Sequence, residues 1–135
     1  METNFTKQNI KEISVLALSF IGDGVHTVFV RDYILKNQNL LIGSYHNKAI
    51  KFCSAGAQAK VFDEIFESLT EEEKEIALRA RNAKGHKAKN ASIENYKKAT
   101  AFEAVIGYLY LLKEYERLNQ ILNLSVKIIE GENLC

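Results

Sequence analysis

The chain has 135 residues, 47% of them hydrophobic and 26% charged, and its formal net charge is +1. This length and balance predict one soluble domain over residues 1–135, large enough to bury a core without disulfide bonds or a structural metal. They exclude a disulfide-rich scaffold, because Cys53 and Cys135 are the only cysteines. No apolar stretch is long and uncharged enough to cross a bilayer, and the first residues lack the order of a signal peptide. We therefore expect a cytoplasmic protein with no membrane association.

Apolar residues recur every three or four positions along most of the chain, which is the pattern of amphipathic helices. The predicted helices cover, in chain order, residues 10–36, 44–66, 70–82, 92–113 and 114–129. Gly22 and Gly24 are possible interruptions of the first helix. No segment shows sustained alternation with period two. The sequence therefore predicts an all-α domain of about five to seven helices and no sheet.

Hydroxyl side chains mark three of the expected helix starts. Ser44 and Ser92 precede apolar periodic runs, as N-cap residues do. Thr70 stands three residues before Glu73, which is the spacing of a capping box. Residues 83–91 between two of the helices have little apolar content, so we expect a mobile basic loop there.

Two single carboxylates lie in runs that are otherwise apolar or small. Asp23 is the only charged residue between positions 13 and 30, and Glu103 is the only one between positions 99 and 112. A buried carboxylate without a partner costs several kcal/mol or changes its pKa, so each one needs compensation. A divalent cation would supply it, and the structural alternative is that Asp23 caps a helix near the glycines while Glu103 pairs with Lys98 or Arg117. The pattern alone leaves both readings open.

A hydroxyl accompanies each of these acids. Ser19 lies four residues before Asp23 and Thr100 three residues before Glu103, so each hydroxyl should share a helical face with its carboxylate. All of these ligands are oxygens. Hard oxygen donors with room for water favour Mg²⁺, with Mn²⁺ as a possible substitute, over zinc.

Charge is segregated along the chain although the total is close to zero. Residues 63–75 hold seven acids and one base, whereas residues 79–98 hold seven bases and one acid. The basic residues of the second segment are Arg79, Arg81, Lys84, Lys87, Lys89, Lys97 and Lys98. The segment is either a solvated face or a surface that binds a polyanion.

Five ordered segments resemble the ribonuclease III family. They are Phe20–Val25 around Asp23, His46–Ala49, Ser54–Ala59, Arg79–Lys84 and Thr100–Gly107 around Glu103. The segment at Arg79 is similar to one found in the Mini-ribonuclease III branch. The resemblance covers residues 13–125 and implies a ribonuclease III-type endonuclease domain. Ser19 and Thr100 stand where the wider family usually has two more acids, so the resemblance implies a reduced metal site.

What the resemblance implies about function is specific. It implies a metal-dependent endoribonuclease that cleaves double-stranded RNA to 5′-phosphate products. Asp23 and Glu103 would be the catalytic metal ligands, and Ser19 and Thr100 would orient the metal-bound waters without binding the metal. The catalytic domain would pair with itself as a homodimer, without a double-stranded-RNA-binding domain. The substrate would be precursor large-subunit (23S) ribosomal RNA, with a large-subunit ribosomal protein as a possible partner. The alternative is a non-catalytic RNA-binding or ribosome-assembly module on the same fold.

RNA contacts are expected from the basic segment. Duplex RNA is recognised mainly through its phosphates, 2′-hydroxyls and shape. The residues expected to bind RNA are Arg79, Arg81, Lys84, Lys87, Lys89 and His46. His46 is more readily explained as a structural histidine or an RNA contact than as a general base. The sequence assigns no role to Gln58, which is either a buried polar contact or a site residue, and His26 gives no stronger signal.

Overall fold

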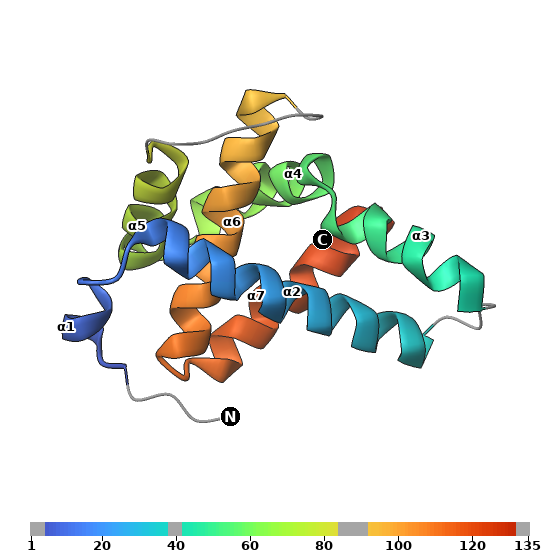
Figure 1. The fold of residues 1–135 in the computed structure, drawn as a ribbon, viewed down its shortest axis with the longest axis horizontal. Coiled ribbons are helices and arrows are strands. Elements are labelled where there is room, and N and C mark those ends of the chain that lie inside the picture. The colour runs from blue at the N-terminus through green and yellow to red at the C-terminus, as the bar shows by residue number, and fades with distance from the viewer. Residues whose placement is uncertain (1–4, 38–41, 84–91, 132–135) are drawn as a thin grey trace.

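The computed structural model describes residues 5–37, 42–83 and 92–131. They form seven α-helices and one short 3₁₀ helix, and these ranges contain no strand, which confirms the predicted all-α class. The helices are α1 (Lys7–Ile10), α2 (Val15–Asn37), α3 (Ile42–Cys53), α4 (Ala55–Ile65), η1 (Phe66–Ser68), α5 (Glu71–Arg81), α6 (Ile93–Leu111) and α7 (Tyr115–Glu130). Figure 1 shows α2 crossing in front of α6.

Helix α6 is the centre of the fold. Ten of its residues are buried, in an almost unbroken run from Ala99 to Leu109 that Glu103 alone interrupts. Because α6 is apolar on nearly every side, it must be surrounded, and it packs against α2, α4, α5 and α7. The main core cluster gathers around it. A charged group within the buried stretch from Ala99 to Leu109 is therefore placed in the interior of the domain.

Two glycines allow α2 and α6 to touch backbone to backbone. A Cβ atom at Gly22 would overlap the carbonyl of Glu103, and one at Gly107 would overlap the carbonyl of Leu18. Only glycine permits so close an approach. Gly22 immediately precedes Asp23, so this contact brings the two carboxylate-bearing positions together.

The predicted capping residues are confirmed at two helices. Thr70 and Glu73 form a reciprocal capping box at the start of α5. The Ser92 side chain accepts a hydrogen bond from the Asn95 backbone N–H at the start of α6. These local signals placed both helix starts correctly, because a cap acts within a single turn.

Two helix predictions were wrong. The helix expected over residues 44–66 is divided at Ser54, which has an extended backbone (φ −63, ψ 156) and caps α4 through a hydrogen bond from the Ala57 N–H. Ser44 lies inside α3. The helix expected from residue 10 is also divided, because α1 ends at Ile10 and α2 begins at Val15. Gly22 and Gly24, by contrast, leave α2 uninterrupted.

The predicted basic loop lies largely outside the described residues. Within those residues, none of the helices combines the length and the hydropathy that crossing a membrane requires.

Candidate active site

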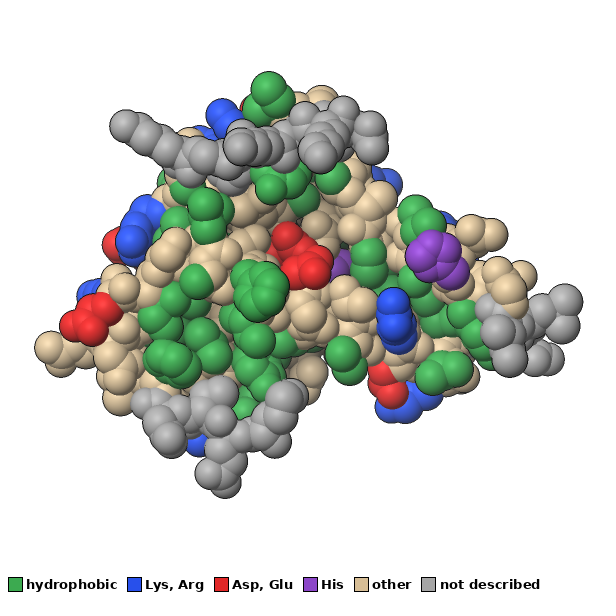
Figure 2. Space-filling view, viewed as in Figure 1, with side chains coloured by type: hydrophobic (Ala, Val, Ile, Leu, Met, Phe, Trp, Pro, Cys, Tyr) green, Lys and Arg blue, Asp and Glu red, His purple; other side chains and the backbone are tan. Residues whose placement is uncertain are grey.

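The two single carboxylates lie next to each other at the crossing of α2 and α6. Asp23 is exposed and Glu103 is half-buried. Their carboxyl groups are close enough for Asp23 to raise the pKa of Glu103. On the face in Figure 2, acidic side chains gather near the centre, surrounded mainly by apolar and uncharged side chains. Because Asp23 is exposed and Glu103 is flanked by buried residues of α6, the acid pair opens to solvent on one side and has the core behind it.

Neutral donors hold both oxygens of Glu103. Ser19 Oγ donates to Oε1 at 3.4 Å, and Gln58 Nε2 donates to Oε2 at 3.4 Å. Ser19 comes from α2 and Gln58 from α4, so three helices meet at this one carboxylate. Both hydrogen bonds are long and hence weak. They orient the carboxylate but bring no positive charge to it.

The environment raises the pKa of Glu103 from its ordinary 4.5 to about 9. Burial is the largest cause, followed by the hydrogen bond and the negative charge of Asp23, while the donors Gln58 and Ser19 act in the opposite direction. A carboxyl group so perturbed by burial and by a like charge in a solvent-accessible site is a marker of function. At neutral pH the pair holds a proton unless a cation replaces it.

The structural alternative for the two acids is wrong. Asp23 lies in the middle of α2 and caps no helix end. Lys98 forms ion pairs with Asp63 and Glu94, and Arg117 pairs with Glu73. Among the residues that the structure describes, no lysine or arginine forms an ion pair with Asp23 or Glu103. Within the described ranges, the charge of this pair is thus left without a cationic partner.

A buried histidine lies behind the acid pair. His26 is 2% exposed and packs edge-on against Phe102. Its Nδ1 lies 2.9 Å from Gln58 Nε2. Burial lowers the pKa of His26 to about 4, although the charge of Asp23 acts in the opposite direction. The imidazole is therefore neutral at physiological pH, and in the tautomer protonated on Nε2 its Nδ1 accepts a hydrogen bond from Gln58.

Ser19 and Thr100 have different surroundings. Ser19 contacts Glu103, on the other helix, although Asp23 was its expected neighbour. Thr100 is buried, and its hydroxyl donates to the Tyr96 carbonyl at 2.9 Å, one turn back in its own helix. The structure thus brings Ser19 to the acid pair and leaves Thr100 bonded to the α6 backbone.

The described residues that were expected to bind RNA lie on other helices than the two acids. Arg79 is exposed and Arg81 half-buried at the end of α5, and His46 is exposed on α3. His46 lines a groove of about 360 Å³ between α2 and α3, together with Arg31 and Tyr45. Lys84, Lys87 and Lys89 lie outside the described residues.

The donor set fits a magnesium-type ion. Two carboxylates, Asp23 and Glu103, are available, and Ser19 adds a hydroxyl beside them. Within the described ranges no group of three or more His, Cys, Asp or Glu side chains could hold a metal. This excludes a metal cage built wholly from such side chains there. Mg²⁺ characteristically uses one or two carboxylates and completes its octahedron with water and substrate phosphates, so the pair suits it.

Sequence reasoning did not assign His26 or Gln58 to this site. Both are spaced regularly within apolar helices, and that pattern is the same for a core residue as for a site residue. The one available signal was that Gln58 is an uncharged polar residue in an otherwise apolar helical pattern, because an amide that becomes buried there needs hydrogen-bond partners. Those partners come from other helices and are visible only in the folded chain.

Comparisons with known proteins find relatives that match most of this chain. A family model described as "Ribonuclease III domain" matches residues 16–114. The chain is 47% identical to a Mini-ribonuclease 3 of Clostridium tetani over 96% of this chain and 91% of that protein. It is 40% identical to the Mini-ribonuclease 3 of Staphylococcus aureus over 93% of this chain and 96% of that protein.

A solved structure also resembles this fold. The X-ray crystal structure of a protein from Fusobacterium nucleatum is 34% identical in sequence and matches with a TM-score of 0.80. The match covers 88% of this chain and 96% of that one. The helical arrangement seen here is therefore shared with an experimentally determined structure.

Proposed function

The chain belongs to the ribonuclease III family, in the branch of the Mini-ribonuclease 3 endoribonucleases, and we propose that Asp23 and Glu103 are the metal ligands with which it cleaves double-stranded RNA. The observation that carries this proposal is the uncompensated pair at the α2–α6 crossing. Glu103 is held inside the domain against a second carboxylate, with neutral donors around it. A divalent cation would satisfy both charges at once.

Magnesium is the proposed ion, with manganese as a substitute. When bound, it lowers the pKa of a water and stabilises negative charge on the phosphate during phosphodiester hydrolysis. Asp23 is exposed and faces the solvent from which RNA approaches, and Glu103 lies on the interior side of the metal site. Ser19 orients Glu103 through its hydroxyl. Thr100 supports the position of the same α6 turn through its bond to the Tyr96 carbonyl.

RNA affinity is proposed to come from positive residues beyond the acid pair. Arg79 and Arg81 end α5, directly before the segment that holds Lys84, Lys87 and Lys89. Arg79 is exposed, and His46 is exposed on α3, so both are free to meet phosphates. Contacts of this kind follow the RNA backbone and carry little sequence information.

A homodimer is proposed because α2 exposes large apolar side chains beside Asp23. Phe20 is 82% exposed, Val28 68% and Leu35 67%. Their spacing of eight and seven residues places them on one helical stripe. Monomeric soluble proteins rarely leave such a stripe open, so a second copy is its expected cover. Each subunit would then bring one acid pair and cut one strand of the duplex.

The proposed substrate is the precursor of large-subunit (23S) ribosomal RNA in the cytoplasm, with a large-subunit ribosomal protein as a possible partner. The support is the resemblance to the Mini-ribonuclease 3 branch. Mapping ribosomal RNA ends in cells that lack the protein tests this substrate. Mature ends identical to those of the parent cells would refute it.

The catalytic assignment is tested by Asp23→Asn and Glu103→Gln. We expect either change to reduce cleavage of labelled duplex RNA in Mg²⁺ by on the order of 10³-fold, since the metal's share of the barrier is several kcal/mol. Binding of the same RNA should remain. The matched controls are Asp32→Asn on α2 and Glu94→Gln on α6, whose acids pair with lysines. Undiminished cleavage by either site variant would refute the assignment of these two acids. If the wild type also fails to cleave the RNA, the alternative of a non-catalytic RNA-binding module is favoured.

The basic segment is tested by changing Lys84, Lys87 and Lys89 together to alanine. RNA binding should weaken. The slope of the logarithm of the binding constant against the logarithm of the salt concentration should also become less steep, by roughly 0.7–0.9 for each phosphate that these lysines no longer neutralise. Lys127→Ala, an exposed lysine of α7, is the control. If the triple variant binds RNA with the affinity and the salt dependence of the wild type, these lysines serve only to keep the protein soluble.

A further inference from the structure

One buried amide links the acid pair to the core. Gln58 is 4% exposed and lies in the first turns of α4. Its Nε2 lies 2.9 Å from His26 Nδ1 on α2 and 3.4 Å from Glu103 Oε2 on α6. A single side chain therefore connects the three helices that surround the acids.

The chemistry of its two neighbours fixes the orientation of this amide. The Gln58 nitrogen carries two N–H groups, and both neighbouring atoms are acceptors. His26 is neutral because it is buried, and in the tautomer that carries its proton on Nε2 its Nδ1 presents a lone pair to Gln58. Turning the amide over would place its carbonyl oxygen against the Glu103 carboxylate and against that lone pair. The hydrogen-bond network thus determines the assignment of oxygen and nitrogen.

We propose that Gln58, anchored by His26, is a positioning residue that fixes the Glu103 carboxylate for binding of the divalent metal ion. The inference rests on the proposed function. Ser19 engages Oε1 and Gln58 engages Oε2, so the carboxylate plane is held from both ends. Each oxygen keeps a further lone pair for a metal. Gln58 itself reaches neither metal nor RNA and acts through Glu103.

An amide suits this position in a site with two acids. A third carboxylate would add charge to a pair that already repels itself inside the domain. The amide orients Glu103 without adding charge. His26 is needed because a glutamine side chain with one N–H unused could rotate away, and the short 2.9 Å contact prevents that rotation. Partners of metal ligands that act in this way typically change metal affinity about 10- to 100-fold when they are removed.

The experiment compares Gln58→Met with Gln120→Met. Methionine has nearly the volume of glutamine but no N–H donor, and Gln120 accepts from Arg117 elsewhere in the domain. Mn²⁺ binding to the RNA-free protein is measured by electron paramagnetic resonance, below the melting temperature of each variant. We expect Gln58→Met to weaken Mn²⁺ affinity about 10- to 100-fold and Gln120→Met to leave it unchanged. The Mg²⁺ concentration that half-saturates cleavage should rise in parallel, with a smaller change in kcat at saturating Mg²⁺.

The result that overturns the inference is wild-type Mn²⁺ affinity in Gln58→Met, whatever happens to its melting temperature. Asp23→Asn separates this failure from that of the proposed function. If Asp23→Asn and the wild type bind Mn²⁺ equally, the metal site itself is wrong. If only Asp23→Asn loses binding, the acids hold the metal and Gln58 is merely a core residue.

A measurement on the wild type covers the case in which Gln58→Met does not fold. The side-chain amide resonances of Gln58 are followed by nuclear magnetic resonance while Mg²⁺ is added. We expect them to shift with the saturation of the metal site, because their acceptor becomes a metal ligand, and we expect those of Gln120 to stay in place. Unmoved Gln58 resonances at saturating Mg²⁺ would overturn the inference.

Discussion

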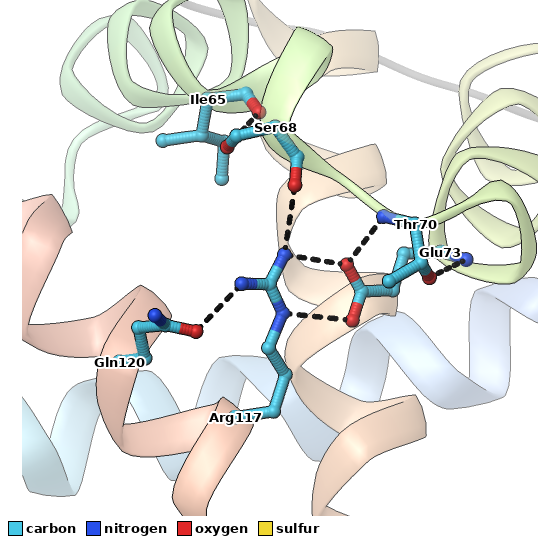
Figure 3. Close-up of polar contacts among 6 residues, drawn as sticks. All are labelled: Ile65, Ser68, Thr70, Glu73, Arg117 and Gln120. Atoms are coloured by element: carbon cyan, nitrogen blue, oxygen red, sulfur yellow. Dashed lines mark hydrogen bonds and ion pairs between the residues drawn. The ribbon is translucent and has the colours of Figure 1, made fainter.

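Two glutamates in this small domain, Glu73 and Glu103, differ in whether a positively charged side chain pairs with them. Glu73, at the start of α5, is 3% exposed and receives Arg117 through both carboxylate oxygens, at 3.0 Å from Nε and 2.8 Å from Nη2 (Figure 3). The Thr70 backbone N–H donates to it as well. Glu103 faces the carboxylate of Asp23 and only neutral donors. In the part of the chain that the structure describes, Glu73 has a cationic partner and Glu103 has none.

The pKa values of the two residues express this difference. Burial acts to raise the pKa of Glu73, but the Arg117 and Thr70 hydrogen bonds together with the charge of Arg117 outweigh it, so the pKa lies below its ordinary value. Burial also raises the pKa of Glu103, and Asp23 raises it further, to about 9. Burial of an acid is thus no sign of function by itself. The sign of function is a buried acid that receives no cationic side chain from the described residues.

The largest expected effect on stability comes from breaking the compensated site. Arg117→Met should lower the free energy of unfolding by about 3 kcal/mol, the lower end of the range for an orphaned buried charge, because the Arg117 side chain is 26% exposed. Lys98→Met is the control, since its partners Asp63 and Glu94 are largely exposed, and it should cost about 1 kcal/mol or less. Urea unfolding measures both. Equal losses of stability in the two variants would contradict the idea that Glu73 depends on Arg117 for its charge compensation.

A smaller effect is expected when a cation is supplied to the uncompensated site. Mg²⁺ at about 100 times its Kd should stabilise the wild type by about 2.7 kcal/mol, because only the folded state brings the two acids together. Glu103→Gln should lose this stabilisation and Glu94→Gln should keep it. Urea unfolding with Mg²⁺ and with a chelator gives the difference. Stabilisation of Glu103→Gln to the wild-type extent would show that Mg²⁺ binds elsewhere.

The smallest effect is expected from pH in the presence of a chelator. Between the ordinary pKa of Glu103, 4.5, and its folded value of about 9, the folded state binds a proton that the unfolded state releases. The free energy of unfolding of the protein therefore falls as pH rises through this interval. His26 acts oppositely, since its folded pKa of about 4 lies below 6.5, but that contribution ends near pH 6.5. Solvent screening of the half-buried Glu103 keeps the effect modest.

The measurement is the melting temperature of the metal-free protein from pH 6.5 to pH 9. The wild type should lose stability across this interval, and Glu103→Gln should lose much less. Parallel curves for the two proteins would mean that Glu103 does not hold a proton there. Added Mg²⁺ should flatten the wild-type curve, since the cation replaces the proton.

Much of this fold could be predicted from local patterns. Thr70 and Ser92 marked the starts of α5 and α6, because a capping hydrogen bond closes within one turn. Ser54 was missed because apolar periodicity continues on both sides of it, so no change of pattern marks the break between α3 and α4. Gly22 was interpreted as a possible interruption, whereas its role is to admit the backbone of α6.

The sequence by itself determined that Asp23 and Glu103 are exceptional, since each is a single charge in an apolar helix and that fact is local. Only the tertiary structure decided which of the candidate partners they have. Arg117 goes to Glu73, Lys98 to Asp63, and Gln58 to Glu103. The physical reason is that these contacts join residues 35 to 45 positions apart, on different helices whose packing is set only in the folded chain. Helical periodicity says which face of a helix is buried, but not which residue of another helix meets it.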